Sequence, residues 1–232
     1  MRERASPNWD ERPAGAGPEL LVLHYTGMPT AEGALDRLCD PAARVSAHYL
    51  IDEDGSVWAL VPEERRAWHA GRSWWRGRAG LNDVSVGIEL VNPGHEWGYR
   101  PFPEAQMAAL VPLAQAIMDR WAMPAWQVVA HSDIAPDRKE DPGELFDWER
   151  LAGEGIGIWP LPGERLDAVG DARRALAAIG YPLEDQGVSL RQSLVAFQRR
   201  FRQRLPDGRA DEETLRRLDD VVALLRARGA IS

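Results

Sequence analysis

The stretch ELLVLHYT, residues 19–26, decides the fold of this chain. It is an apolar run of strand length that closes on a histidine, and it is rich in the branched residues that strands favour. Four runs of the same kind follow along the chain: AHYLID (47–52), SVWALVP (56–62), VSVGIELV (84–91) and WQVVAHSD (126–133). The first half of the chain therefore predicts a β-sheet.

Helical segments alternate with these strands. TAEGALDRLCD (30–40) and PEAQMAALVPLAQAIMDRW (103–121) have helical character, and Pro112 is expected to kink or restart the second. The turn DEDG (52–55) indicates a hairpin between two of the strands, which would make the sheet mixed instead of purely parallel. We predict an α/β fold in which a mixed central β-sheet is flanked by helices.

The C-terminal part has a different pattern. The segment 153–164, GEGIGIWPLPGE, holds four Gly and two Pro without periodicity and is predicted to be a linker. Ser189 with Gln192 forms a capping box, and Asp211 is a second predicted helix N-cap. We predict one domain over 1–152 and a small all-α three-helix domain over 165–232. The apolar faces of its helices are Val169, Leu176 and Ile179, then Leu190, Leu194, Phe197 and Phe201, then Leu215, Leu218, Val222 and Leu225.

Composition excludes several classes of protein. The net charge is −8, and residues 1–162 hold 15 basic and 25 acidic residues, against 13 and 11 in residues 163–232. Neither part has the concentrated basic face of a nucleic-acid binder. No apolar run approaches the length of about 18 residues that spans a membrane.

The first 20 residues lack the apolar segment of a secretion signal, and the single Cys39 fits a reducing compartment. We expect a cytoplasmic protein, with the cell envelope as the alternative if a leader has been removed. The oligomeric state is left open.

Polar side chains close three of the strand candidates, at His24, Glu89 and His131. Side chains at strand ends converge on a crevice in sheets of this kind. Asp141 follows His131 by ten positions, through a loop stiffened by Pro136. Two imidazoles and one carboxylate bind Zn²⁺ and leave a fourth position for water, so we predict a site for one zinc ion.

Each of these residues has a simpler role when taken alone. A histidine that ends a strand is often only hydrogen-bonded, Asp-Pro-Gly is usually a turn, and Glu89 on its own reads as a solvated or salt-bridged edge residue. Their combination on matching strand ends favours a metal-dependent hydrolase.

Lys139 adds to this interpretation because it is the only lysine among 28 basic residues. A compact ammonium close to a metal stabilises the oxyanion of a tetrahedral intermediate, whereas the planar fork of arginine prefers two partners. Glu89 is suited to take a proton from water and pass it to a leaving amine.

Four motifs carry a resemblance to a known family: LVLHYTG, VSAHYLIDEDGSVWALVPEERRAWHAG, LNDVSVGIELVN and VVAHSDIAPDRKEDPG. Over about residues 8–150 the chain resembles the zinc-dependent N-acetylmuramoyl-L-alanine amidases. The tail, with SLVAFQRRF and PDGRADEETLRRL, resembles the three-helix peptidoglycan-binding domain.

The resemblance implies roles for particular residues. His24, His131 and Asp141 would bind the zinc ion, Glu89 would act on the water, and Lys139 would stabilise the oxyanion. The substrate would be peptidoglycan fragments or muropeptides, cut between the lactyl group of N-acetylmuramic acid and L-alanine in a recycling role.

Three further residues are candidates for substrate contacts. Arg44 is suited to pair with a stem-peptide carboxylate, His69 to lie on the rim of the groove, and Asn82 to bond peptide amides, although surface, turn and structural roles are open for all three. His48 is predicted to support the site from within a strand. Two alternatives to the amidase remain: a non-catalytic peptidoglycan-recognition module, and a zinc peptidase that cuts within the stem peptide.

Overall fold

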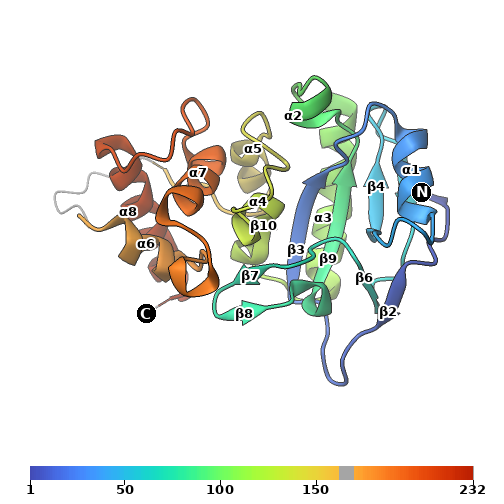
Figure 1. Ribbon diagram of the computed structural model, residues 1–232, viewed down its shortest axis with the longest axis horizontal. Coiled ribbons are helices and arrows are strands. Elements are labelled where there is room, and N and C mark those ends of the chain that lie inside the picture. Colours follow the sequence, from blue (N-terminus) through green and yellow to red (C-terminus); the bar gives the residue numbers. More distant parts are fainter. Residues whose placement is uncertain (162–169, 232) are drawn as a thin grey trace.

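The computed structural model describes residues 1–161 and 170–231, and its centre is a six-stranded sheet (Figure 1). The strand order is β1-β5-β4-β9-β3-β10, and β3 pairs in parallel with β9 on one side and with β10 on the other. β4 is parallel to β9 but antiparallel to β5, across the turn at 52–55. The predicted mixed sheet and its hairpin are therefore confirmed.

The strands are β1 (Arg2–Glu3), β2 (Trp9–Glu11), β3 (Leu20–Tyr25), β4 (Tyr49–Ile51), β5 (Val57–Ala59), β6 (Arg65–Ala67), β7 (Trp74–Trp75), β8 (Arg78–Ala79), β9 (Ser85–Leu90) and β10 (Val128–Ala130). The α-helices are α1 (Ala31–Cys39), α2 (Gly94–Trp97), α3 (Glu104–Arg120), α4 (His131–Ile134), α5 (Trp148–Gly153), α6 (Ala172–Ile179), α7 (Leu190–Phe201) and α8 (Glu212–Ala227). Short 3₁₀ turns lie at η1 (Leu81–Val84), η2 (Ala125–Gln127) and η3 (Glu184–Gln186).

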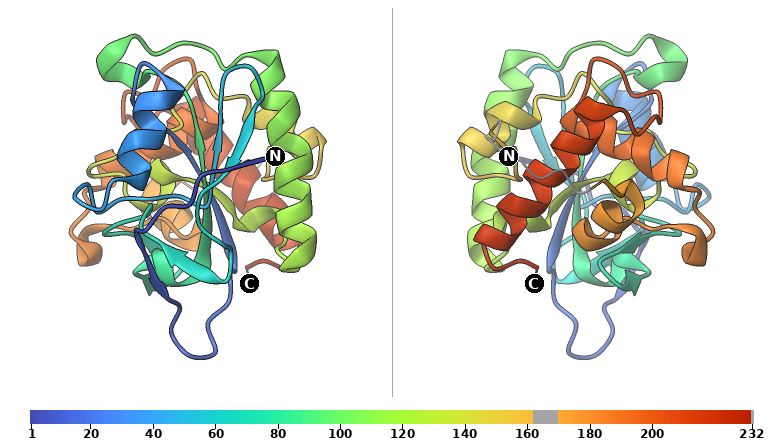
Figure 2. Two further views of the ribbon diagram at one scale, coloured as in Figure 1. Left: turned by 90° about the vertical axis from the view of Figure 1, so that its right-hand side faces the viewer. Right: turned by 90° about the vertical axis from the view of Figure 1, so that its left-hand side faces the viewer.

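Side chains alternate along a strand, so the two faces of the sheet carry different residues. One face packs in the apolar core, and the other carries predicted site residues. Leu21 and Leu23 of β3 and Ile88 of β9 share one buried apolar cluster with Leu110 of α3, which runs along that face of the sheet (Figure 2). α3 continues through Pro112 as one helix, so the predicted restart there is wrong. The alternate residues of the same strands point to the opposite face, and these include the predicted site residues.

The C-terminal part consists of α6, α7 and α8 in the portion of it that the structure describes. Both predicted caps are present: the Ser189 side chain accepts from the backbone N–H of Gln192 within a capping box, and Asp211 caps α8 through Thr214. The predicted face residue Val169 lies outside the described residues. Leu176, Phe197 and Leu218 are buried together, as the helical periodicity predicts.

The helical part shares its core with the sheet. Val129 of β10 and Ile134 of α4 belong to the same buried cluster as Phe197 of α7. The segment 154–161 has no helix or strand, yet Ile156 and Ile158 in it are buried. The last residues of the predicted linker lie beyond the described segment, and the predicted domain boundaries stay a prediction.

Membrane-spanning segments are absent from the described part of the chain: no helix there is both long and apolar enough to cross a bilayer.

Candidate metal centre

The sheet register brings the predicted ligands together. His24 of β3 lies opposite Glu89 of β9, and Ala130 of β10 lies opposite Leu23, so that the next residue, His131, follows beside His24. The loop after α4 returns Asp141 to the same point. The Nδ1 atoms of His24 and His131 are 2.9 Å apart, and the Asp141 Oδ2 lies 3.1 Å from the first and 2.9 Å from the second.

The proton positions on His24 follow from a chain of hydrogen bonds. The Ser85 hydroxyl donates to the carbonyl of Leu81 (2.7 Å), so its oxygen accepts from His69 Nε2–H (3.1 Å). The Nδ1 of His69 then has a lone pair, which accepts from His24 Nε2–H (3.0 Å). His24 Nδ1 is left without a proton and faces the other two donor atoms.

His131 reaches the same state by a shorter route, because its Nε2–H donates to the carbonyl of Ala70 (3.3 Å). Both histidines therefore bond through one ring nitrogen to the surrounding protein and offer the other, which is the usual arrangement of metal-bound imidazoles. The candidate ligand atoms of the three residues all lie within 4.8 Å of one another, close enough to share one ion.

Electrostatics favour the neutral form of His24. Burial, helped by the neighbouring His131, lowers the pKa of His24 to about 4, so its imidazole is neutral at pH 7. Three lone pairs at about 3 Å repel one another unless a cation lies between them, so this donor set fits a metal ion.

Glu89 faces the same space. Its Oε2 is a buried carboxylate oxygen with no hydrogen-bond partner among the residues that the structure describes. Burial, followed by the charge of Asp141, raises the pKa of Glu89 well above the ordinary value, and Lys139 opposes this shift. A buried carboxyl group with a raised pKa is suited to accept and return a proton.

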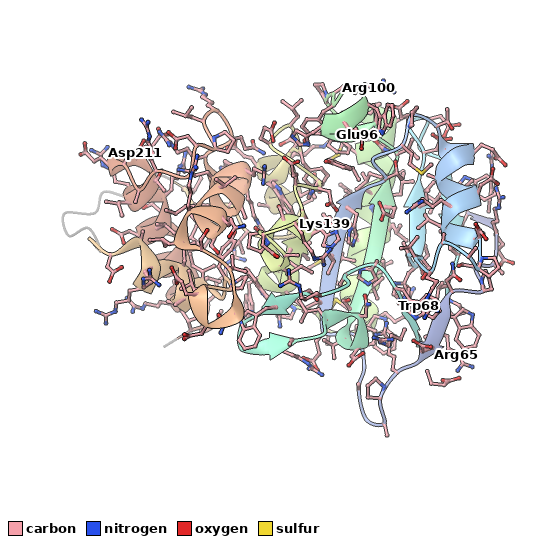
Figure 3. All side chains as sticks on the ribbon, in the orientation of Figure 1. Arg65, Trp68, Glu96, Arg100, Lys139 and Asp211 are labelled. Atoms are coloured by element: carbon pink, nitrogen blue, oxygen red, sulfur yellow. The ribbon has the colours of Figure 1, made fainter. Side chains whose placement is uncertain are left out.

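The site opens into a cavity of about 330 Å³, with Glu89, His131, Lys139 and Asp141 among its lining residues. Figure 3 shows Lys139 beside β3, in the middle of the molecule. Within the described ranges, 1–161 and 170–231, the ammonium of Lys139 has no hydrogen-bond or salt-bridge partner. It is therefore free to bind a substrate oxygen.

The predicted substrate contacts lie in different places. His69 lines the cavity but is also the partner of His24, so it supports a candidate metal ligand. Asn82 does not line this cavity; its Oδ1 accepts from the backbone N–H groups of His69 (3.1 Å) and Ala70 (2.7 Å) and so holds their loop. Arg44 is exposed and lies over the ring of Trp68, which does line the cavity.

The buried His48 and the half-buried Arg12 complete the support of the site from behind. His48 lies directly before β4, so its predicted place within a strand is wrong. Its Nδ1 accepts from the backbone N–H of Gly87 (3.0 Å), and its Nε2–H donates to the carbonyl of Arg65 (3.1 Å), as a supporting role requires. Arg12 is a residue that sequence reasoning missed: its guanidinium donates to the carbonyls of Glu63, Asn82, Asp83 and Ser85. Nothing in the sequence around Arg12 signals this role, because its partners lie 51 or more residues away.

The fold and these residues define a hydrolase with a candidate metal site on a mixed α/β sheet. The sequence model of the family described as N-acetylmuramoyl-L-alanine amidase matches residues 14–144, and the chain belongs to this family. A second model, described as a peptidoglycan binding domain, matches residues 165–218.

Several relatives are similar over most of their length. The N-acetylmuramoyl-L-alanine amidase AmiD of Escherichia coli K12 is 41% identical over 221 residues, which are 84% of this chain and 79% of that protein. The crystal structure of E. coli AmiD with the substrate anhydro-N-acetylmuramic acid-L-Ala-D-γ-Glu-L-Lys has a TM-score of 0.78 at 37% identity, covering 94% of this chain and 93% of that one. AmpDh3 of Pseudomonas aeruginosa has a TM-score of 0.81 at 32% identity, covering 96% and 99%.

Proposed function

We propose that this chain hydrolyses the amide bond between the lactyl group of N-acetylmuramic acid and L-alanine, using one zinc ion bound by His24, His131 and Asp141. The observation that carries the proposal is the meeting of three deprotonated donor atoms within 3.1 Å of one another, at the wall of a cavity that also holds Glu89 and Lys139. Membership of the amidase family supports the choice of bond.

The residues of the chain divide the reaction between them. His24, His131 and Asp141 would hold the zinc ion, which would supply Lewis-acid chemistry at the amide carbonyl and at water. Glu89 accepts a proton from the water whose oxygen attacks the lactyl carbonyl carbon, and returns it to the nitrogen of L-alanine as the C–N bond breaks. The ammonium of Lys139 stabilises the negative charge on the carbonyl oxygen. The products are a lactyl carboxylate and a peptide with a free amino terminus.

Variants of the two catalytic residues test the proposal. Glu89→Gln and Lys139→Ala are expected to bind zinc as the unaltered protein does and to lose turnover of a soluble anhydromuramyl tripeptide, by about 10²-fold or more. His24→Ala is expected to lose the metal as well. Metal analysis and mass spectrometry of the released peptide measure both effects.

The exposed Glu149→Gln is the matched control and should keep full activity. Full hydrolysis after exhaustive chelation would contradict the proposal. Shorter peptides lacking L-alanine would favour the peptidase alternative, and binding without any release would favour the recognition module.

The domain assignment is part of the proposal: an amidase domain over 1–152, a linker over 153–164 and a peptidoglycan-binding domain over 165–232. We propose a cytoplasmic role in the recycling of muropeptides, with the cell envelope as the alternative. A recycling enzyme should cut soluble anhydromuramyl peptides faster than insoluble sacculi, whereas the opposite preference would favour the envelope.

A further inference from the structure

Two consecutive arginines of α7 reach from the helical part to the segment that holds two of the three proposed metal ligands. That segment runs from His131 to Asp141. Arg200 forms an ion pair with Asp133 at 2.7 Å, and Arg199 forms one with Glu140 at 2.7 Å. One contact thus lies two residues after the first ligand, and the other lies one residue before the second.

The inner contact is buried on both sides. The side chains of Arg200 and Asp133 are 4% and 0% exposed. Asp133 also accepts from the hydroxyl of Tyr181, a residue of the helical part, at 2.6 Å. The Arg200 guanidinium donates to the carbonyl of Val128 (3.1 Å) and lies 4.0 Å above the ring of Trp148. A buried charge held on several sides has little freedom to move, and removing its partner leaves it uncompensated.

The helical turn that contains Asp133 connects to both ligands. Asp133 accepts from the backbone N–H of Ala130, the residue before His131, at 2.9 Å. The backbone N–H of Ser132 donates to the carbonyl of Asp141 at 2.9 Å. α4 is a single turn of four residues, and one helical turn is not stable by itself. Its position, and with it the directions of both ligands, depends on what holds Asp133.

We infer that α7 positions the metal-ligand segment, with Arg200 as the main positioning residue. The helical part then contributes to metal affinity at the catalytic centre, beyond any contact it makes with peptidoglycan. This inference rests on the proposed metal site. Arg200 is a positioning residue because it lines no part of the cavity around the metal centre and acts through Asp133.

The test compares an arginine of α7 with the arginine at the C-cap of the same helix, in the whole chain. Arg200→Met removes the contact to Asp133. Arg202→Met is the matched control, because the Arg202 side chain is also only 8% exposed, yet its ion pairs are to Asp211 and Glu213 within the helical part. The dissociation constant for Zn²⁺ is measured by competition with a chelator, and hydrogen exchange follows residues 131–141 in the metal-free protein.

Arg200→Met is expected to weaken zinc binding by about 10-fold or more, because substitutions of residues that support metal ligands have effects of this size. It is also expected to speed amide hydrogen exchange in residues 131–141. On the soluble substrate kcat should fall while KM stays close to its original value. Arg200→Lys should recover part of the affinity. Arg202→Met should lower the melting temperature without changing zinc affinity.

Equal zinc affinity in Arg200→Met and the unaltered protein would overturn the inference, and so would an equal loss in both arginine variants. If Arg200→Met does not fold, Tyr181→Phe removes only one hydroxyl from Asp133 and should give a smaller loss of affinity, with no loss again counting against the inference. An unaltered protein that binds no zinc would instead overturn the proposed function.

Discussion

The imidazole of His69 lies directly on Gly87, so close that a Cβ at position 87 would be 2.5 Å from the His69 Cγ. Any side chain there displaces the ring, and His69 is the residue that fixes the tautomer of His24. The sequence predicts His24, Glu89 and His131 because side chains at the ends of neighbouring strands converge, and it predicts Asp141 from a stiffened loop ten positions after His131. It does not predict the partnership of His24 and His69, which lie 45 residues apart in separate elements and meet only through packing.

Gly87→Ala is therefore expected to weaken zinc binding by about 10-fold to 100-fold, because His24 loses the partner that orients it. Turnover should fall with it. Chelator competition measures the affinity, and Gly153→Ala, where a Cβ would meet nothing within 4 Å, is the matched control. Unchanged affinity in Gly87→Ala would show that His69 does not orient the ligand.

Whole elements were predictable where their signals are local. The capping box at Ser189 and the cap at Asp211 are set by residues within three positions, and the sequence predicts both. The pairs β1–β5 and β7–β8 were not predicted, because strands of two residues have no periodicity and form only against a partner. α4 was missed for a similar reason, since tertiary contacts at Asp133 hold it.

Ser189→Ala tests the cap of α7. Losing the side-chain acceptor for the backbone N–H of Gln192 should lower the free energy of unfolding by about 1 kcal/mol. Ser189→Asp keeps an acceptor at the same place and should stay close to the original stability. Urea unfolding measures both, and an equal loss in the two variants would mean that the cap does not stabilise the helix.

At the scale of the molecule, the sequence predicts two parts but not how closely they pack. The Gly and Pro residues in 153–164 indicate a linker. This composition gives no sign that Ile156 and Ile158 of the same segment are buried. The helical part shares a core with β10 and α4 and has a buried ion pair with the sheet part, so local composition could not predict the contact. We expect the two parts to unfold together, because a shared core makes separate unfolding costly.

Global stability should also depend on pH, through histidines that fold as neutral groups. Burial lowers the pKa of His48 to about 3, whereas an unfolded histidine titrates near 6.5. The unfolded chain therefore binds the extra proton first as the pH falls, so the contribution of His48 is complete above about pH 6.5 and is lost progressively down to about pH 3.

The loss from this one residue is about 1.4 kcal/mol per pH unit, or roughly 2 kcal/mol between pH 7.5 and pH 5. His48→Gln keeps one acceptor and one donor but does not titrate, so the stability difference between it and the unaltered protein should shrink by that amount over the same interval. Urea unfolding of both proteins with a chelator present excludes any effect of metal loss. Parallel curves of unfolding free energy against pH for the two proteins would mean that His48 binds a proton as readily in the folded chain as in the unfolded one. That result would contradict the hydrogen bond that its Nδ1 accepts from the backbone N–H of Gly87.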